Sequence, residues 1–208
     1  MPMRVCKLCF KNIKDNSLIG FIHTSLSLCP QCYRRLSPKF KRFYVFKYHA
    51  LAFYDYDQDI KALLYQLKGC FDYELGPSFL DRYLNEMRLR YHDYFVIPIP
   101  SYKEDDDKRE FNHVQEIFKG LKLPLLTILQ KTDHYKQATN NREQRKQIGK
   151  YMILDSTKSL KGKKVLLVDD VFTTGSTMKA AIKLVEQLKP KDIKILVMSK
   201  TTNARHYN

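Results

Sequence analysis

The sequence predicts an α/β fold, in which helices flank a parallel sheet, together with a small N-terminal four-cysteine module. From about residue 57 to the end, strand-like and helix-like segments alternate, which is typical of a parallel sheet. The strand at 165–168, the helix after it and the next strand form one βαβ unit. Two Cys-x2-Cys pairs lie near the N-terminus. We therefore divide the chain into a cysteine module at 1–36, a basic, aromatic connection at 37–56 and an α/β domain at 57–208.

Helices are expected where apolar residues recur at helical spacing. Residues 59–67 place their apolar side chains on one face: Ile60, Leu63, Leu64 and Leu67. The same reasoning predicts further helices over 77–90, 111–121 and 176–188.

Buried strands are expected where apolar residues run without a break. Such runs occur at 94–99, 165–168 and 193–198, and the prolines at 98 and 100 are expected to end the first. The polar segments 101–110 and 130–150 show little periodicity, so we expect long loops there.

The four N-terminal cysteines have the spacing of a metal site. Cys6 and Cys9 form one pair, Cys29 and Cys32 the other, and nineteen residues separate the pairs. Each pair can form a tight knuckle, and together they offer four thiolates in a tetrahedron. Because four sulfur ligands leave no open position, this predicts a structural zinc ion in a zinc-binding module. Free buried thiols or a redox pair are the alternatives.

The fifth cysteine, Cys70, has no partner His or Cys near it in sequence. It is interpreted as a small residue at a helix end, with a reactive thiol as the alternative.

The charge of the chain is strongly basic. Its 208 residues include 37 Lys and Arg against 22 Asp and Glu, a formal net charge of +15. Such a chain is attracted to polyanions, most often nucleic acid, although a solubilising charge is the alternative. Residues 1–50 carry ten basic residues and one acid, so a contact with a phosphate backbone is expected there first. No apolar run approaches the roughly 18 residues of a membrane span, and no signal peptide is recognised, which predicts a cytoplasmic protein without membrane insertion.

The segment from Val165 to Thr177 carries the clearest chemistry. An apolar strand leads to Asp169 and Asp170, and the chain then enters a helix through five small residues: Thr173, Thr174, Gly175, Ser176 and Thr177. Ligands bind beyond the carboxyl ends of strands in open α/β sheets, and small residues let backbone N–H groups approach a phosphate at a helix N-terminus. The acids would face sugar hydroxyls or Mg²⁺. The alternative is a capped helix with both acids in solvent.

This segment resembles the diphosphosugar-binding signature of type I phosphoribosyltransferases. The resemblance implies a type I phosphoribosyltransferase-like sheet. It implies that Asp169 and Asp170 contact the ribose hydroxyls of phosphoribosyl pyrophosphate (PRPP) and that residues 173–177 hold its 5′-phosphate. It also implies a pyrophosphate-side loop at Ser101 and Tyr102, with Mg²⁺ as the partner of PRPP.

The order of motifs along the whole chain is similar to the ComF family of competence proteins. The cysteine module comes first, followed by Val96–Pro100, Lys108–Asn112, Gln137 with Arg142 and Arg145, and the acid pair. The resemblance implies a role in natural transformation, during single-stranded DNA uptake on the cytoplasmic side, alongside a helicase-like ATPase. Where the family usually has glycine after the arginine, this chain has Glu110, which would be strained if the backbone there needs a positive φ.

Two further stretches combine basic residues with other features. The long loops carry Lys108, Arg109, Lys131, Lys136, Arg142, Arg145 and Lys146. Arg109 and Arg145 in particular are candidates to close over a pyrophosphate, against the alternative of solvated charge. Residues 40–48 mix bases and rings as single-strand binders do, although alternating aromatics also make an ordinary strand, and we favour packing.

Three functions fit these observations. The first is a DNA-uptake accessory protein that binds PRPP or a related sugar phosphate and single-stranded DNA. The second is an active Mg²⁺-dependent phosphoribosyltransferase, and the third is a non-enzymatic PRPP sensor or scaffold. No general acid or base can be named from the sequence, so catalysis stays open.

Overall fold

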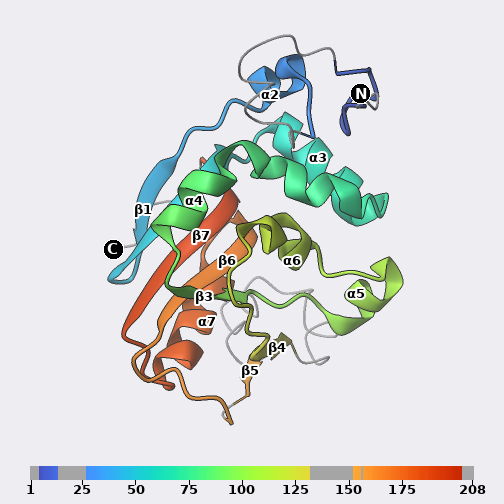
Figure 1. Ribbon diagram of the computed structural model, residues 1–208. Coiled ribbons are helices and arrows are strands. Elements are labelled where there is room, and N and C mark those ends of the chain that lie inside the picture. The colour runs from blue at the N-terminus through green and yellow to red at the C-terminus, as the bar shows by residue number, and fades with distance from the viewer. Residues whose placement is uncertain (1–4, 14–26, 132–151, 156, 203–208) are drawn as a thin grey trace.

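A computed structural model describes residues 5–13, 27–131, 152–155 and 157–202. Its centre is a five-stranded sheet with the order β1-β2-β7-β6-β3 (Figure 1). The strands are β1 (Lys41–Val45), β2 (Tyr48–Asp55), β3 (Tyr94–Pro98), β6 (Lys164–Phe172) and β7 (Asp192–Lys200). Only β1 is antiparallel to its neighbour, and the other pairings are parallel. The predicted α/β fold with a mostly parallel sheet is confirmed.

Helices cover both faces of the sheet because its strands are apolar on both sides. On β6, Leu166 and Val168 face a core shared with α3 (Gln58–Gly69), α4 (Leu84–Arg90) and α6 (His113–Phe118). Val165 and Leu167 alternate to the opposite face, where the core includes α7 (Ser176–Glu186). A small antiparallel pair, β4 (Leu129–Lys131) and β5 (Met152–Leu154), adds to this second core.

Two of the predicted helices form almost as expected. Helix α3 begins where the Asp57 side chain accepts a hydrogen bond from the Ile60 N–H, a standard N-cap. It buries Ile60, Leu63, Leu64 and Leu67, the four residues that the spacing had placed on one face. Helix α7 buries Met178, Ala181, Ile182 and Val185 in the same way.

The helix predicted over 77–90 is wrong in its first half. That region holds two 3₁₀ segments, η1 (Tyr73–Phe79) and η2 (Asp81–Tyr83), before α4 begins. Pro77 lies inside η1 and cannot donate a backbone hydrogen bond. Asp81 is buried and accepts from the Ser27 N–H and the Tyr33 hydroxyl, so tertiary partners replace a continuous helix here.

The segments on either side of residue 110 also differ from expectation. The predicted loop 101–110 contains a helix, α5 (Lys103–Arg109), with no buried residue. It has acids in its first turn and bases in its last, which suits the helix dipole but leaves no apolar pattern to detect. The next helix, predicted over 111–121, begins later because Asn112 caps α6, and it finishes as a 3₁₀ turn, η3 (Lys119–Leu121).

The stretch at 37–56 forms the hairpin of β1 and β2, so it belongs to the sheet. Phe43 packs on Phe172 with ring centroids 4.8 Å apart, and Phe40 packs on Tyr83 at 5.0 Å. The packing that we favoured is therefore observed for Phe40 and Phe43. Tyr44, by contrast, is 63% exposed. The three-part division of the chain stays a prediction.

Among the described residues, no helix combines the length and the apolar character that crossing a membrane requires.

Candidate functional site

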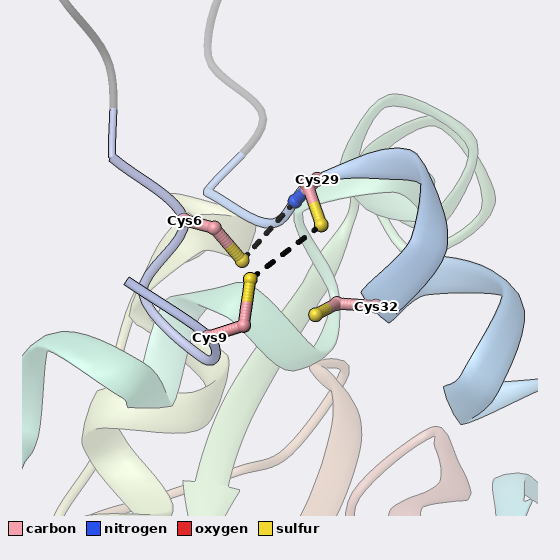
Figure 2. A group of neighbouring side chains, drawn as sticks. All are labelled: Cys6, Cys9, Cys29 and Cys32. Atoms are coloured by element: carbon pink, nitrogen blue, oxygen red, sulfur yellow. Dashed lines mark hydrogen bonds between the residues drawn. The ribbon is translucent and has the colours of Figure 1, made fainter. Parts of the chain in front are cut away.

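The four N-terminal cysteines come together in space (Figure 2). The first knuckle is closed by backbone hydrogen bonds from the Phe10 N–H to the Cys6 carbonyl and from the Cys6 N–H to the Lys11 carbonyl. Cys29 caps α2 (Pro30–Leu36), a short helix that carries Cys32. All four Sγ atoms lie within 4.8 Å of one another.

This arrangement fits a zinc ion. Zn–S bonds of about 2.3 Å in a tetrahedron place the sulfur atoms roughly 3.8 Å apart. The Sγ atoms of Cys9 and Cys29 are 3.8 Å apart. Cys6 Sγ also accepts a hydrogen bond from the Cys29 N–H at 3.3 Å. Burial would raise the pKa of Cys6, but backbone N–H groups outweigh it and lower the pKa to about 7. Cys6, Cys9, Cys29 and Cys32 would hold the metal as a closed structural site.

The cysteine module packs directly on the α/β domain. Cys6, Leu28, Cys32, Tyr33 and Leu36 are buried in the same core as α3. Polar contacts reinforce this packing: Lys7 pairs with Glu74 at 2.9 Å, Arg35 pairs with Asp59, and Asp81 accepts from Tyr33 and Ser27. The cysteine cluster and helix α3 are therefore parts of one packed unit.

The second site lies at the carboxyl end of β6. This strand is longer than predicted: it continues through Asp169 and Asp170 to Phe172 before the chain turns into α7. Thr173 and Thr174 are exposed, and the Thr174 hydroxyl lies 3.0 Å from that of Ser176. The N-cap residue of α7, Gly175, provides no side-chain cap, and the first turn contains no acid; the Ser176 N–H makes only a long bond to the Thr174 hydroxyl, at 3.4 Å. The N–H groups of α7 and the positive end of its dipole therefore face this turn, as an anion-binding loop requires.

Gly175 is required by the shape of the turn. Its φ is +75°, a left-handed conformation that costs other residues about 1–2 kcal/mol. A Cβ atom at this position would lie 2.5 Å from the Phe172 ring. Phe172 is itself buried against Phe43 from β1. The core thus fixes the path of the loop.

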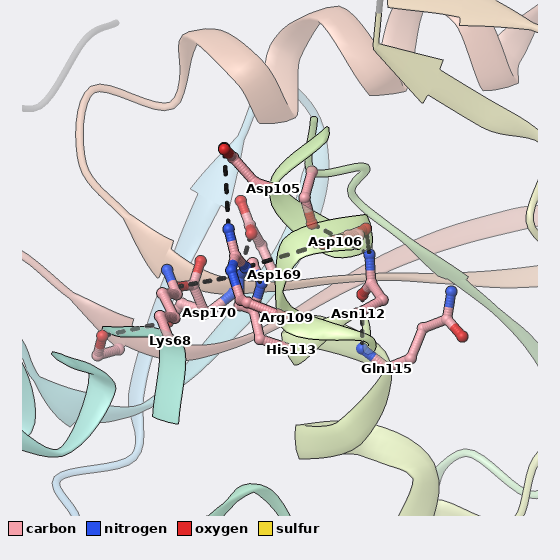
Figure 3. A network of polar contacts seen from close by, with 11 residues as sticks. Lys68, Asp105, Asp106, Arg109, Asn112, His113, Gln115, Asp169 and Asp170 are labelled. Carbon is pink, nitrogen blue, oxygen red and sulfur yellow. Dashed lines mark hydrogen bonds and ion pairs between the residues drawn. The ribbon is translucent and has the colours of Figure 1, made fainter. Parts of the chain in front are cut away.

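The acid pair is surrounded by basic and polar side chains from several elements (Figure 3). Asp170 is only 7% exposed, and its Oδ2 pairs with Lys68 Nζ, from the last turn of α3. His113 Nε2, from the start of α6, lies 3.7 Å from the same oxygen. Asp169 Oδ1 accepts a hydrogen bond from the Asp170 N–H at 2.9 Å.

The electrostatics of the two acids differ. Burial and the neighbouring Asp170 charge raise the pKa of Asp169 well above its ordinary value. Burial would raise the pKa of Asp170 too, but the Lys68 ammonium outweighs it and lowers the pKa to about 2. Burial and the Lys68 charge lower the pKa of His113 to about 3, so its imidazole is neutral. Burial also lowers the pKa of Lys131, and the nearby Asp169 and Asp170 act in the opposite direction.

Arg109 reaches the acid pair through His113. Its guanidinium donates to His113 Nδ1 at 2.8 Å, which leaves the imidazole proton on Nε2, the nitrogen nearest Asp170. Asn112 donates to Ser101 Oγ at 3.0 Å, and Lys131 Nζ lies 4.8 Å from the centre of the Tyr102 ring. The structure therefore brings Ser101, Tyr102 and Arg109 to the same side of the sheet as the acids.

Glu110 has the positive φ that would strain a residue other than glycine at this position. It caps α5 with a φ of +62°, in the left-handed region that glycine adopts freely. The chain therefore keeps the turn and pays the conformational cost of a non-glycine residue there.

Sequence reasoning missed Lys68 and His113. Lys68 lies some hundred residues before the acids, and no local motif marks it. The candidates Arg145, Arg142, Gln137, Lys136 and Lys146 lie outside the described residues. Cys70 is exposed at the end of α3, where its N–H continues the helix bonding, in agreement with the helix-end interpretation.

A separate cationic groove of about 300 Å³ lies at the opposite, amino-terminal end of β2 and β7. Arg42, Arg90 and Lys194 line it together with His49 and Tyr91, and its described lining contains no acid. Arg90 has an exposed partner in Glu86 at 3.1 Å. The ring of exposed Tyr44 lies 4.6 Å from that of His49, which adds an aromatic surface to the groove.

Comparison with known proteins supports the predicted resemblance. Residues 111–205 match the phosphoribosyl transferase domain family. The chain is 29% identical over 143 residues to competence protein ComFC of Streptococcus pneumoniae (strain ATCC BAA-255 / R6). That match covers 69% of this chain and 64% of the relative's length. Residues 111–205 are thus similar to phosphoribosyl transferase domains, and the chain is similar to a competence protein, as its motifs predicted.

Solved structures of lower similarity include two purine enzymes. A hypoxanthine phosphoribosyltransferase from Staphylococcus aureus is 17% identical with a TM-score of 0.41, over 73% of this chain and 68% of the other. A hypoxanthine-guanine phosphoribosyltransferase from Bacillus anthracis str. 'Ames Ancestor' is 14% identical with a TM-score of 0.44, over 66% and 73%. At this level of similarity, neither enzyme's substrate is evidence for the substrate of this chain.

Proposed function

We propose that this chain binds PRPP or a related sugar phosphate at the carboxyl end of β6 and acts in the cytoplasm as an accessory protein of natural transformation. The observation that carries the proposal is the β6–α7 turn: a helix N-terminus without a side-chain cap from its N-cap residue, a glycine that core packing requires, and small hydroxyl residues beside the half-buried Asp169 and the buried Asp170. The match to the phosphoribosyl transferase domain supports the ligand class, and the similarity to ComFC supports the process.

Each part of the site has a role in this proposal. Residues 173–177 hold the 5′-phosphate through backbone N–H groups and hydroxyls. The acid pair, Asp169 and Asp170, forms the ribose side. Ser101, Tyr102 and Arg109 form the pyrophosphate side, and Arg145 joins them. A guanidinium suits this position because it can contact several phosphate oxygens at once.

Mg²⁺ is expected to arrive with the pyrophosphate of the ligand. The cation prefers oxygen ligands and usually keeps several waters. Within the described ranges, the four cysteines are the one cluster of His, Cys, Asp or Glu that could hold an ion, so no separate resident cage is assigned. Asp169 is the protein carboxylate that would face the Mg²⁺–ligand complex, and Mg²⁺ would supply neutralisation of the pyrophosphate charge.

Isothermal titration tests the ligand directly. We expect the chain to bind PRPP with Mg²⁺ more tightly than ribose 5-phosphate or pyrophosphate alone. Asp169→Asn should weaken binding at least tenfold, whereas Asp155→Asn should not, because the half-exposed Asp155 side chain bonds only the neighbouring Thr157. Equal affinity of the wild type and Asp169→Asn would overturn the site assignment.

Turnover distinguishes the enzyme from the sensor. A phosphoribosyltransferase would release pyrophosphate from PRPP when offered an acceptor base or amine. Tight PRPP binding without pyrophosphate release across a panel of acceptors would support the non-enzymatic sensor or scaffold. Either result is compatible with a role in transformation, which is measured as transformation frequency in cells that carry the Asp169→Asn chain.

A second activity, binding of single-stranded DNA, is favoured by the cationic groove. Three cations, two ring systems and no acid in the described lining suit a phosphate backbone with neighbouring bases. Among the basic residues of the N-terminal quarter, the groove identifies Arg42 as the candidate for a DNA contact. Arg35 and Lys41 have carboxylate partners, whereas no ion pair with Arg42 is found within the described part of the chain.

Charge reversal tests the groove. Arg42→Glu, Arg90→Glu and Lys194→Glu together should weaken binding of a labelled oligonucleotide and reduce its salt dependence by about 2 in log–log slope, since each phosphate contact contributes roughly 0.7. Reversal of Lys158, Lys161 and Lys191, which are exposed elsewhere, controls for net charge. Equal losses in both variants would contradict a specific groove. A helicase-like ATPase is the protein partner expected in this process.

A further inference from the structure

The sugar-phosphate site poses a charge problem. Asp169 and Asp170 are adjacent in β6, where Asp169 is half-buried and Asp170 is only 7% exposed. Two neighbouring carboxylates with little access to water repel each other, and ionised carboxylates repel an incoming phosphate. A site of this kind therefore needs a fixed positive charge close to the acids before the ligand arrives.

Lys68 supplies that charge from a rigid position. Its ammonium pairs with Asp170 Oδ2, and its side chain is 33% exposed. It lies in the last turn of α3, a helix anchored to the core by Ile60, Leu63, Leu64 and Leu67. Because the core fixes the helix, it also fixes where the ammonium meets the carboxylate.

The other groups around Asp170 do not replace Lys68. His113, from α6, lies 3.7 Å from Oδ2 and is neutral, with Nδ1 accepting from Arg109 of α5 at 2.8 Å. Arg109 therefore directs its charge at His113 and the acids of its own helix, Asp105 and Asp106, each at 3.8 Å. Lys131 of β4 stacks over Tyr102, and Asp169 is a carboxyl group that cannot supply a cation.

We propose that Lys68 is a positioning residue of the sugar-phosphate site: it neutralises Asp170 and holds that carboxylate against α3, so that Asp169 is the acid that meets the ligand. This inference rests on the proposed function. It divides the acid pair into a ligand-facing member and an anchored member. It also makes α3, which lies outside the matched residues 111–205, part of the site.

The main test is the pH dependence of PRPP affinity for Lys68→Met. Without the ammonium, an unpaired carboxylate lies beneath the phosphate-bearing ligand, and affinity should fall about tenfold at pH 8. Loss of its cation also raises the pKa of Asp170, so that protonation at lower pH removes the repelling charge. The ratio of wild-type to variant affinity should therefore be largest at pH 8 and shrink towards pH 5. Taking this ratio cancels the titration of the ligand itself.

Matched variants keep the test specific. Lys68→Arg should bind PRPP nearly as the wild type does, because it keeps the charge. Lys61→Met changes an exposed lysine of the same helix and should leave affinity and its pH profile unchanged. Thermal unfolding of each variant shows that the protein tested is folded.

A double variant separates anchoring from ligand contact. Lys68→Met with Asp170→Asn removes both charges, so no unpaired carboxylate is left at position 170. If Asp170 acts by position, the double variant recovers most of the affinity lost in Lys68→Met and loses the pH dependence. If Asp170 itself binds the ribose, the double variant is no better than the single one, and the inference is overturned.

The outcomes also separate this inference from the proposed function. Normal PRPP binding by the wild type together with an unchanged affinity and pH profile in Lys68→Met would overturn the inference alone. A wild-type chain that binds no PRPP would overturn the proposed function and, with it, the inference that rests on it.

Discussion

The cysteine centre and the sugar-phosphate site are assembled in different ways. The cysteine centre takes its four ligands from two short knuckles, and each knuckle is shaped by its own backbone hydrogen bonds. The sugar-phosphate site combines a local turn in β6 and α7 with Lys68, Arg109 and His113 from three other helices. The comparison teaches that local spacing suffices to bring the four cysteines together, whereas the charge balance around the two acids depends on the tertiary fold.

Cys29→Ser should have the largest effect on stability, because it removes one of the four proposed ligands of a single metal ion. We expect loss of bound zinc and local unfolding of the two cysteine knuckles, because these short segments bury little core of their own and rely on the metal in addition to their packing on the α/β domain. Zinc content per chain and far-ultraviolet circular dichroism measure this. Cys70→Ser, a change at the exposed cysteine, is the matched control and should keep one zinc per chain. Full stability of metal-free Cys29→Ser protein would show that the cysteines are simple thiols.

Gly175→Ala tests the local half of the phosphate site. The added Cβ meets both the positive φ and the Phe172 ring, so we expect a loss of about 2–3 kcal/mol of stability and PRPP binding weakened at least tenfold. Gly162→Ala is a close control: its φ is +77° but no atom lies within 4 Å of the added Cβ. That variant should lose only the conformational part, about 1 kcal/mol, and bind PRPP normally. Equal effects at both glycines would show that the contact between residue 175 and the Phe172 ring is not what shapes the loop.

The pH dependence of stability tests the tertiary half. The folded-state pKa of Asp170 is lowered to about 2, below its value in the unfolded chain, so ionised Asp170 stabilises the fold at neutral pH. This contribution should be complete above about pH 5 and lost as the pH falls through the folded pKa, a change of roughly 2–3 kcal/mol. Urea unfolding of the wild type and Asp170→Asn between pH 6 and pH 2 measures the difference. A difference that stays constant over this range would contradict the Lys68–Asp170 pair.

Glu110→Gly should have the smallest effect and the opposite sign. Relief of the positive φ is worth about 1–2 kcal/mol, and the greater freedom of glycine in the unfolded chain offsets about 0.5–1 kcal/mol of it. We therefore expect a net stabilisation of about 0.5 kcal/mol in urea unfolding. Lys108→Gly, inside the neighbouring helix α5, should instead destabilise by about 1 kcal/mol. A destabilised Glu110→Gly protein would mean that the Glu110 side chain makes a contact that matters more than its backbone.

A region can be predicted from the sequence when its structure depends on residues that lie close together in the chain. The cysteine spacing and the Asp169–Thr177 run are local patterns, and both can be recognised in the sequence alone. Helix α5 was missed because it buries nothing, and the break at Pro77 and Asp81 was missed because Asp81 is bound by Tyr33, far away in sequence. Lys68 and His113 could not be found for the same reason, since only the packing of α3 and α6 on β6 brings them to Asp170.

The most direct test of the whole account is a crystal structure of the full chain with PRPP and Mg²⁺. We expect the 5′-phosphate at the N-terminus of α7 on residues 173–177, the ribose beside Asp169, and Lys68 still paired with Asp170. A ligand bound elsewhere would contradict the proposed function. A ligand in this site with Asp170 released from Lys68 and bonded to the ribose would contradict the division of the acid pair.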